Sequence, residues 1–264
     1  MLNATHREPS PALFEKQSGR IQIERAARTG TATITALLLR MGIAVPFLYF
    51  GAQLAAAPFY PGYSFLARDA STLGSPGSRL PAVFNIGAIC VGIASLLAAW
   101  GFLRALRFLG VRRSLAWLTA LALISSALGD INAGLFPLPD PRHAHGVLAT
   151  CGIGVFLLPF VLPLALWKLV RGGRVAAYFI ANLAALFALF PIMSGMVQRL
   201  AISAGVDMPW YQSFLNNDQG LLQRIFALIV FVPVAVSAWF LVRLLRRSES
   251  SNLPLPSRVS GFHD

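Results

Sequence analysis

The chain has 264 residues, of which 56% are hydrophobic and only 12% are charged, and its mean hydropathy is +0.65. Soluble domains usually carry about 25% charged residues, so the composition excludes an ordinary soluble domain and, with repeated apolar runs of about 20 residues, predicts a membrane protein. The net charge of +12 does not indicate a nucleic-acid-binding protein, because the basic residues follow the loop alternation of membrane proteins.

Six apolar runs separated by polar or turn residues predict an all-α polytopic bundle of six transmembrane helices. Residues 1–30 are polar and basic and predict a cytoplasmic tail, whereas residues 247–264 predict a disordered cytoplasmic tail. The transmembrane domain lies between them, at residues 31–246. Its predicted spans are residues 32–59, 81–102, 114–136, 147–170, 175–197 and 220–245.

The orientation follows from the distribution of charge. Lys and Arg gather in both tails and in the loops after the second and fourth spans, whereas the other loops hold the acids Asp69, Asp130, Asp140, Asp207 and Asp218. Loops rich in Lys and Arg are cytoplasmic. We therefore expect both termini to be cytoplasmic, in a protein of the cell inner (plasma) membrane. The longer outer loop, residues 199–219, holds the aromatic pair expected at a headgroup boundary.

Cysteine and histidine usage argues against several cofactors. Cys90 and Cys151 both fall in apolar runs, so we expect neither a disulfide framework nor a CxxC metal site. No His lies within a predicted span to serve as an axial haem ligand. We expect no cofactor. The expected partners are the lipid bilayer and a lipid or small molecule, and the sequence does not predict an oligomeric state.

The stretch Gly129–His145, GDINAGLFPLPDPRHAH, is the most informative part of the chain. Asp130 closely follows the apolar run ALALISSAL, and an ionisable group inside or at the edge of a membrane helix marks a functional site by default. Other polar residues lie at the outer ends of the remaining helices, where a closed bundle brings them together. The expected ligand-binding residues are Asp69, Ser71, Asn85, Asp130, Asn132, Asp140, His145, Gln223 and Arg224.

Within this group, Arg224 is the expected counter-ion of Asp130 or Asp69. Two interpretations stay open at this point: a structural ion pair that fixes helix packing, or a pocket for a small ligand or lipid headgroup.

A membrane-embedded hydrolase or lipid-modifying enzyme is the first alternative. Its candidate catalytic residues are Asp130, Asp140, His145 and Ser71, the last as a nucleophile with His145 as its base. Zinc could in principle bind Asp130, Asp140, His143 and His145, but no HExxH or similar spacing is present, and we expect no metal. A small transporter is the second alternative, although the polar groups cluster at one end of the helices rather than at the midplane.

Three segments resemble the signatures of the domain-of-unknown-function family 998. They are GYSFLARDASTLGSPGSRLPAVFNIGAICVG, GDINAGLFPLPDPRHAHG and GLLQRI, and the resemblance extends over residues 35–246. It implies six transmembrane helices and at most a lipid-related role, with no activity attached. This chain has Ser-Thr-Leu-Gly where the family often has Ser-Asp-Leu-Gly, with the acid instead at Asp69. The positions that match are Ser71, Gly74, Asn85, Asp130, Pro137, Asp140, His145, Gln223 and Arg224.

Overall fold

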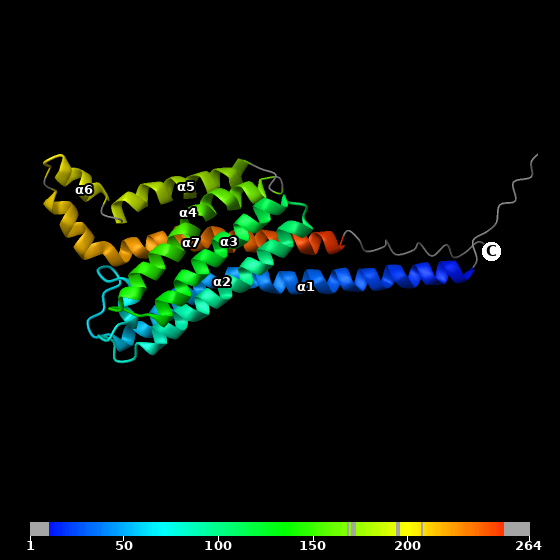
Figure 1. Ribbon diagram of the computed structural model, residues 1–264, viewed down its shortest axis with the longest axis horizontal. Helices are drawn as coiled ribbons and strands as arrows, with labels where there is room; N and C mark the ends of the chain where they lie inside the picture. Colours follow the sequence, from blue (N-terminus) through cyan, green and yellow to red (C-terminus); the bar gives the residue numbers. More distant parts are fainter. Residues whose placement is uncertain (1–10, 168, 170–172, 194–195, 207, 251–264) are drawn as a thin grey trace, which may run out of the picture.

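The computed structural model describes residues 11–167, 169, 173–193, 196–206 and 208–250, and within these ranges the chain is helical with no β-strand (Figure 1). This confirms the predicted all-α class. Two short 3-10 helices, η1 (Ala57–Phe59) and η2 (Ala70–Gly74), lie in the loop after the first helix. The α-helices are α1 (Pro11–Ala56), α2 (Ala82–Phe108), α3 (Arg113–Leu135), α4 (Pro141–Leu166), α5 (Gly173–Met193), α6 (Met196–Ser203) and α7 (Pro209–Ser250).

Four of the six predicted spans are confirmed as helices long and apolar enough to cross a membrane. They are Gly30–Phe59 within α1, Ala82–Phe108, Arg113–Leu135, and Asn217–Ser248 within α7. The other two predicted spans correspond to α4 and α5, whose described apolar stretches are shorter, Gly154–Leu166 and Tyr178–Leu189. A helix satisfies its own backbone hydrogen bonds, which is the requirement that hydrocarbon imposes on a spanning segment.

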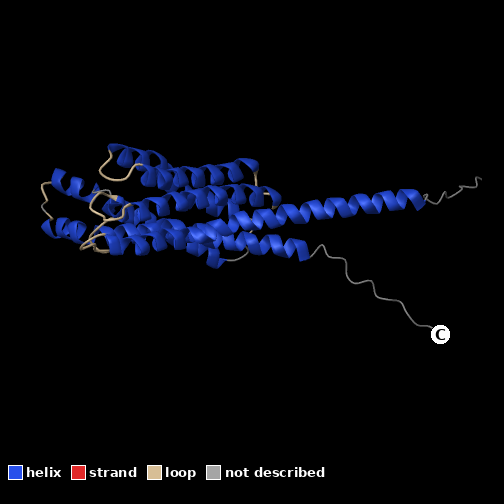
Figure 2. Cartoon of the chain, turned by 90° about the horizontal axis from the view of Figure 1, so that it is seen from below, coloured by secondary structure: helices blue, strands red, loops and turns tan. Residues whose placement is uncertain are grey.

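The long helices run roughly along one direction and pack side by side as a bundle, whereas α6 and the start of α7 are tilted away from it (Figures 1 and 2). Helices α1, α2, α3 and α4 pack in chain order, each against the next, and α7 returns to lie along α1. Helix α5 packs on α7 and α4, at the side of the bundle. The start of α1 and the end of α7 lie at the same end of the molecule, as a chain with an even number of spans requires (Figure 1).

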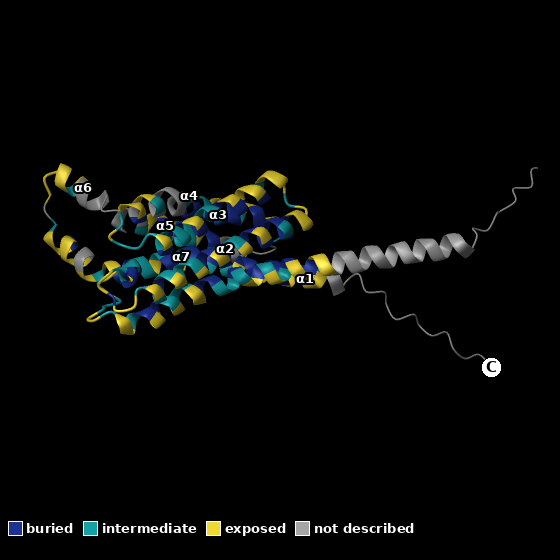
Figure 3. Ribbon diagram, turned by 60° about the horizontal axis from the view of Figure 1, so that its bottom comes forward, coloured by how far each residue is buried: buried dark blue, intermediate teal, exposed yellow. Residues whose placement is uncertain are grey.

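Burial follows the pattern of a protein in lipid. Buried residues lie between the helices and exposed residues on their outer faces (Figure 3). Large apolar side chains on those outer faces are exposed, among them Phe47, Leu164 and Ile180. Lipid tails are as apolar as these side chains, so no hydrophobic penalty attaches to such a face inside a bilayer.

Close approach of α2 and α3 depends on small residues. A Cβ at Gly134 would lie 2.5 Å from the Asn85 carbonyl oxygen and 2.7 Å from Ile89 Cγ1, and a Cβ at Gly92 would lie 2.7 Å from the Ala127 carbonyl oxygen. Small residues that let backbones approach are the usual means of packing helices in membranes. This contact sets the position of the end of α3, which carries Asp130.

The segment between α5 and the last span is more helical than the sequence predicts. The prediction of a loop over residues 199–219 is largely wrong. Helix α6 covers the start of this segment, and α7 begins at Pro209, eleven residues before the predicted span. Proline at the first position is favourable because its missing N–H would have no helical partner. At the N-terminal side, α1 continues back from the first span to Pro11, and α7 runs to Ser250.

Candidate functional site

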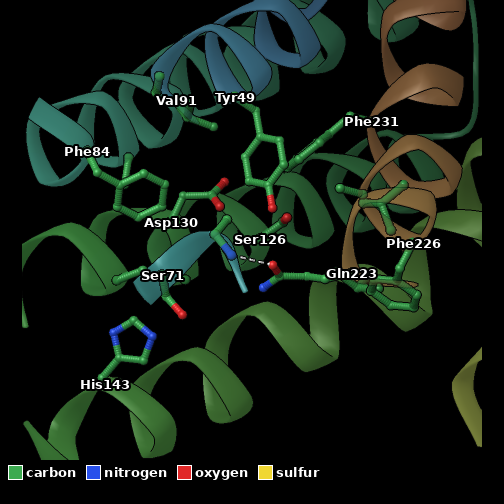
Figure 4. A pocket seen from close by; sticks show the side chains of 18 residues that line it. Tyr49, Ser71, Phe84, Val91, Ser126, Asp130, His143, Gln223, Phe226 and Phe231 are labelled. Carbon is green, nitrogen blue, oxygen red and sulfur yellow. Dashed lines mark hydrogen bonds between the residues drawn. The ribbon is translucent and has the colours of Figure 1, made fainter. Parts of the chain in front are cut away.

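A cavity of about 260 Å³ lies inside the bundle, towards the end at which α3 stops and α4 starts (Figure 4). Five helices and η2 contribute to its wall, so the cavity exists only in the folded bundle. Its lining is mainly apolar, with a few polar groups. The lining residues are Tyr49, Ala52, Ala70, Ser71, Phe84, Ala88, Val91, Ser126, Gly129, Asp130, Ala133, His143, Val155, Gln223, Phe226, Ala227, Val230 and Phe231.

Asp130 supplies the one carboxylate among the described lining residues. Its Oδ2 atom is buried and has no hydrogen-bond partner within the described part of the chain. Figure 4 shows this carboxylate with the ring of Phe84 on one side and that of Tyr49 on the other. Ser126 lies one helical turn earlier on the same face of α3 and also lines the cavity. A buried polar atom without a partner is rare in folded proteins and requires an explanation.

His143 is buried and lines the cavity. Its Nδ1 lies 2.9 Å from the Phe136 carbonyl oxygen, which accepts only, so Nδ1 carries the proton and donates. In the neutral ring Nε2 is then the acceptor, and it is the nitrogen left for a ligand.

His145, the histidine selected from the sequence, is exposed and outside the cavity, with Nδ1 2.8 Å from the Pro141 carbonyl oxygen. The physical reason is that α4 starts at Pro141 rather than after the histidines. Residues two apart on a helix do not share a face. Only one of the two histidines could therefore point into the bundle.

Ser71 and Gln223, two of the expected ligand-binding residues, line the cavity. Ser71 belongs to η2, and Gln223 lies on α7. The Gln223 Oε1 atom accepts a hydrogen bond of 2.7 Å from the backbone N–H of Ala70, drawn as the dashed line in Figure 4. This contact between residues far apart in the sequence holds η2 over the end of the cavity.

No close ion pair forms between Arg224 and Asp130 or Asp69, all of which the structure describes, although the Arg224 charge is near enough to lower the pKa of Asp69. Its NH1 group donates to the carbonyl oxygens of Phe65 (2.7 Å), Arg68 (3.1 Å) and Gly220 (2.6 Å). Its NH2 group donates to the Tyr63 hydroxyl at 2.7 Å. The reason is that the loop after α1 presents several backbone acceptors at one point, and a forked guanidinium satisfies them together.

Asp69 and Tyr63 belong to this loop rather than to the cavity. The Asp69 carboxylate accepts a hydrogen bond of 3.0 Å from the Gln219 side chain. Burial raises the pKa of Asp69 above 3.8, although the nearby Arg224 acts in the opposite direction. Burial likewise raises the pKa of Tyr63, again against the effect of Arg224. We call the group formed by Tyr63, Asp69 and Arg224 the loop anchor.

The remaining predicted site residues fix loops. Asn85 donates to the Gly74 carbonyl oxygen at 3.2 Å, and Asn132 donates to the carbonyl oxygens of Arg142 and His143 at 3.2 and 3.3 Å. Asp140 caps α4 by accepting from the Arg142 backbone N–H at 2.9 Å, and it pairs with the Arg142 guanidinium at 2.7 Å. Hydrogen bonds from Arg142 lower the pKa of Asp140. None of these three residues lines the cavity.

The sequence interpretation missed the aromatic wall of the cavity, formed by Tyr49, Phe84, Phe226 and Phe231. Tyr49 of α1 and Phe231 of α7 contact each other, with ring centroids 5.0 Å apart. These residues lie in apolar runs, where an aromatic side chain gives no sign of whether it faces lipid, core or a cavity. His143 could have been found, since it shares the HAH tripeptide with His145.

The four residues considered as zinc ligands do not come together. Asp130 and His143 line the cavity, whereas Asp140 is bound to Arg142 and His145 is exposed. Across the described residues, no three His, Cys, Asp or Glu side chains gather closely enough to hold an ion.

The long apolar helices and the lipid-compatible outer faces define the class: the chain is a polytopic helical integral membrane protein. A family model described as "Protein of unknown function (DUF998)" matches residues 43–240. The chain belongs to this family, as the three motifs indicated. No curated protein and no solved structure matches the chain.

Proposed function

We propose that this protein binds a small ligand or a lipid headgroup in the cavity around Asp130. The observation that carries the proposal is the buried Asp130 oxygen without a hydrogen-bond partner, at the wall of a cavity rather than in close-packed protein. Ligand sites are typically concave, mainly apolar and provided with a few converging polar groups. The polar groups here are Ser71, Ser126, His143 and Gln223.

The cost of burying Asp130 supports a functional role. A polar group transferred to an apolar environment without a partner costs several kcal/mol, and a charge costs more. Asp140 does not face this cost, because it lies at the surface and is paired with Arg142. Asp130 Oδ2 has no partner among the described residues, so a ligand that donates a hydrogen bond to this atom would remove the cost of leaving it unpaired.

Six transmembrane helices with both termini in the cytoplasm of an inner-membrane protein are part of the proposal, with α4 and α5 as the fourth and fifth spans. Labelling with a membrane-impermeant maleimide tests this in a Cys90→Ala, Cys151→Ala background. A Ser75→Cys protein is expected to react in intact cells, and a Gly110→Cys protein only after permeabilisation. Labelling in the reverse pattern would invert the orientation.

Native mass spectrometry of the full chain, extracted in a mild detergent, tests ligand binding. Wild-type protein is expected to carry a bound small molecule or lipid. Ala133→Phe fills the cavity and is expected to abolish that species, whereas Leu128→Phe, on an exposed face of the same helix, is expected to retain it. Equal retention by both variants, or a bare wild-type protein that no added compound stabilises, would reject the binding function.

A membrane-embedded hydrolase is the second candidate, because Ser71 and His143 both line the cavity and the Ser71 hydroxyl points towards the imidazole in Figure 4. A nucleophile needs an adjacent base. An activity-based fluorophosphonate probe is expected to label Ser71 if this pair is active, and the label must disappear in Ser71→Ala. Absence of wild-type labelling would leave binding as the function.

A further inference from the structure

We propose, on the basis of the binding function above, that the cavity recognises an ammonium group, with Asp130 as its counter-ion and the aromatic wall around it. Ammonium groups are carried both by free amines and by the ethanolamine and choline headgroups of lipids, so the two sources share one chemistry. The aromatic wall would bind the same ammonium group through cation–π interactions.

Charge gives the first line of support. Among the described lining residues there is one carboxylate, that of Asp130, and no Lys or Arg, so ionisation of Asp130 would give the cavity a negative charge. Arg224, the neighbour of Gln223 in the sequence, donates instead to the carbonyl oxygens of Phe65, Arg68 and Gly220. An anionic ligand such as phosphate would find no cation at this wall. A cationic ligand would neutralise a charge that is costly to leave alone in a low-dielectric site.

The aromatic wall gives the second line of support. Tyr49, Phe84, Phe226 and Phe231 reach the cavity from three different helices. Aromatic faces attract ammonium groups, and the attraction is larger where water is excluded. Figure 4 shows the Asp130 carboxylate between the rings of Phe84 and Tyr49, so a cation bound to this carboxylate would also lie beside those rings.

The hydrogen-bond acceptors of the cavity suit the N–H groups of a primary ammonium, whereas a choline group has no N–H and would be held by the carboxylate and the aromatic rings. The Ser126 hydroxyl oxygen can accept, and so can the Nε2 atom of His143, because Nδ1 of that ring already donates to Phe136. A bare metal ion fits less well, since the described residues provide no group of three His, Cys, Asp or Glu ligands. A cavity of about 260 Å³ has room for a headgroup or a small amine.

The test measures binding to the delipidated full chain by thermal shift and native mass spectrometry. The probes are ethanolamine, choline, the uncharged choline isostere 3,3-dimethylbutanol, and inorganic phosphate. Wild-type protein is expected to bind choline or ethanolamine at least about tenfold more tightly than the isostere, which is the ratio that 1.4 kcal/mol of ion pairing gives. Asp130→Asn is expected to remove that preference, and Asp140→Asn, a carboxylate outside the cavity, to keep it.

A second variant separates recognition from folding. Phe84→Leu keeps an apolar side chain but removes the aromatic face, and it is expected to weaken choline binding about threefold to tenfold with little change for the isostere. If wild-type protein binds the isostere as tightly as choline, or if phosphate binds best, ammonium recognition is wrong while ligand binding stands. If no probe or lipid binds at all, the binding function fails as well.

Reconstitution identifies the source of the ammonium group. If the ligand is a headgroup, nanodiscs that contain phosphatidylethanolamine will stabilise wild-type protein relative to discs of phosphatidylglycerol alone. If the ligand is a free amine, added ethanolamine will stabilise the protein in phosphatidylglycerol discs. In either case the stabilisation must disappear in Asp130→Asn, and its persistence there would overturn the proposal.

Discussion

Two polar groups near the end of the bundle at which α1 ends and α4 starts, the loop anchor and the Asp130 cavity, differ in how well the protein satisfies their hydrogen bonds. Arg224 in the loop anchor donates to three carbonyl oxygens and to the Tyr63 hydroxyl, with only its Nε atom left without a partner. Asp130 leaves a buried carboxylate oxygen without any partner, at the wall of a cavity. Both residues lie on helices that cross the same bundle.

The difference separates structural from functional polar groups. A charge whose hydrogen bonds close within the protein holds loops and helices together, and its removal leaves several buried acceptors unsatisfied. A buried charged group that lacks hydrogen-bond partners lowers the stability of the ligand-free protein. A ligand that supplies those partners stabilises the protein–ligand complex. Substitutions in either group, or in the packing that positions it, are therefore expected to have effects of different size.

The largest effect is expected for Arg224→Ala. The substitution removes four hydrogen bonds from a charged donor group, and such bonds are worth about 1.5–3 kcal/mol each. We expect a loss of more than about 3 kcal/mol of stability, measured by thermal unfolding in detergent. The control is Arg243→Ala on the same helix. Arg243 is exposed and lies 3.7 Å from the Trp239 ring centroid, an interaction worth about 0.5–1 kcal/mol. Equal losses in both proteins would show that the loop anchor is not structural.

A smaller loss is expected for Gly134→Ala, which changes the packing beneath Asp130. The added Cβ would lie 2.5 Å from the Asn85 carbonyl oxygen, so α3 must move away from α2. Overpacking of this kind costs about 1–3 kcal/mol. Gly51→Ala is the matched control, because Gly51 is exposed within α1 and a Cβ added there would meet no atom within 4 Å. There the helix gains about 0.5–1 kcal/mol. Destabilisation by both variants alike would mean that close approach of α2 and α3 is unimportant.

A still smaller effect on stability is expected for Asp130→Asn in the ligand-free protein. The substitution removes a buried acid whose Oδ2 has no partner, so no hydrogen bond to that atom is lost. We expect the free energy of unfolding to stay within about 1 kcal/mol of wild type or to rise. Chemical unfolding of the delipidated protein measures it. A loss as large as that of Arg224→Ala would place Asp130 among the structural groups.

The smallest effect concerns the pH dependence contributed by Asp69 in the loop anchor. Because its pKa is raised above 3.8 in the folded protein, the folded state holds the proton more tightly than the unfolded chain. The stability contributed by the protonated Asp69 carboxyl is therefore fully present below pH 3.8. It is lost as the pH rises through the pKa that Asp69 has in the folded protein. We expect Asp69→Asn to flatten the unfolding free energy across that interval. An unchanged slope in the variant would assign the pH dependence to other groups.

The sequence predicts the helical class and part of the cavity, because apolar runs of membrane length and isolated polar residues are local signals. Ser71, Asp130 and Gln223 were found in this way. His143 was considered only as a zinc ligand, and His145 was chosen for the binding and catalytic roles, because the choice depends on α4 starting at Pro141, which sets the face of each residue. The partners of Arg224 were missed because they are mostly backbone carbonyls, which every residue has. The aromatic wall depends on helix rotation, which an unbroken apolar run does not reveal.

The length of α1 has a consequence for the side of the membrane that holds the chain termini. The membrane-spanning part starts at Gly30, yet the helix starts at Pro11 and projects beyond the rest of the bundle (Figure 1). At 1.5 Å per residue, this extension is about 28 Å long. If it stands upright, its tip is roughly three Debye lengths from the headgroups at physiological salt. A fluorophore attached at the tip would then report on aqueous partners rather than on lipid.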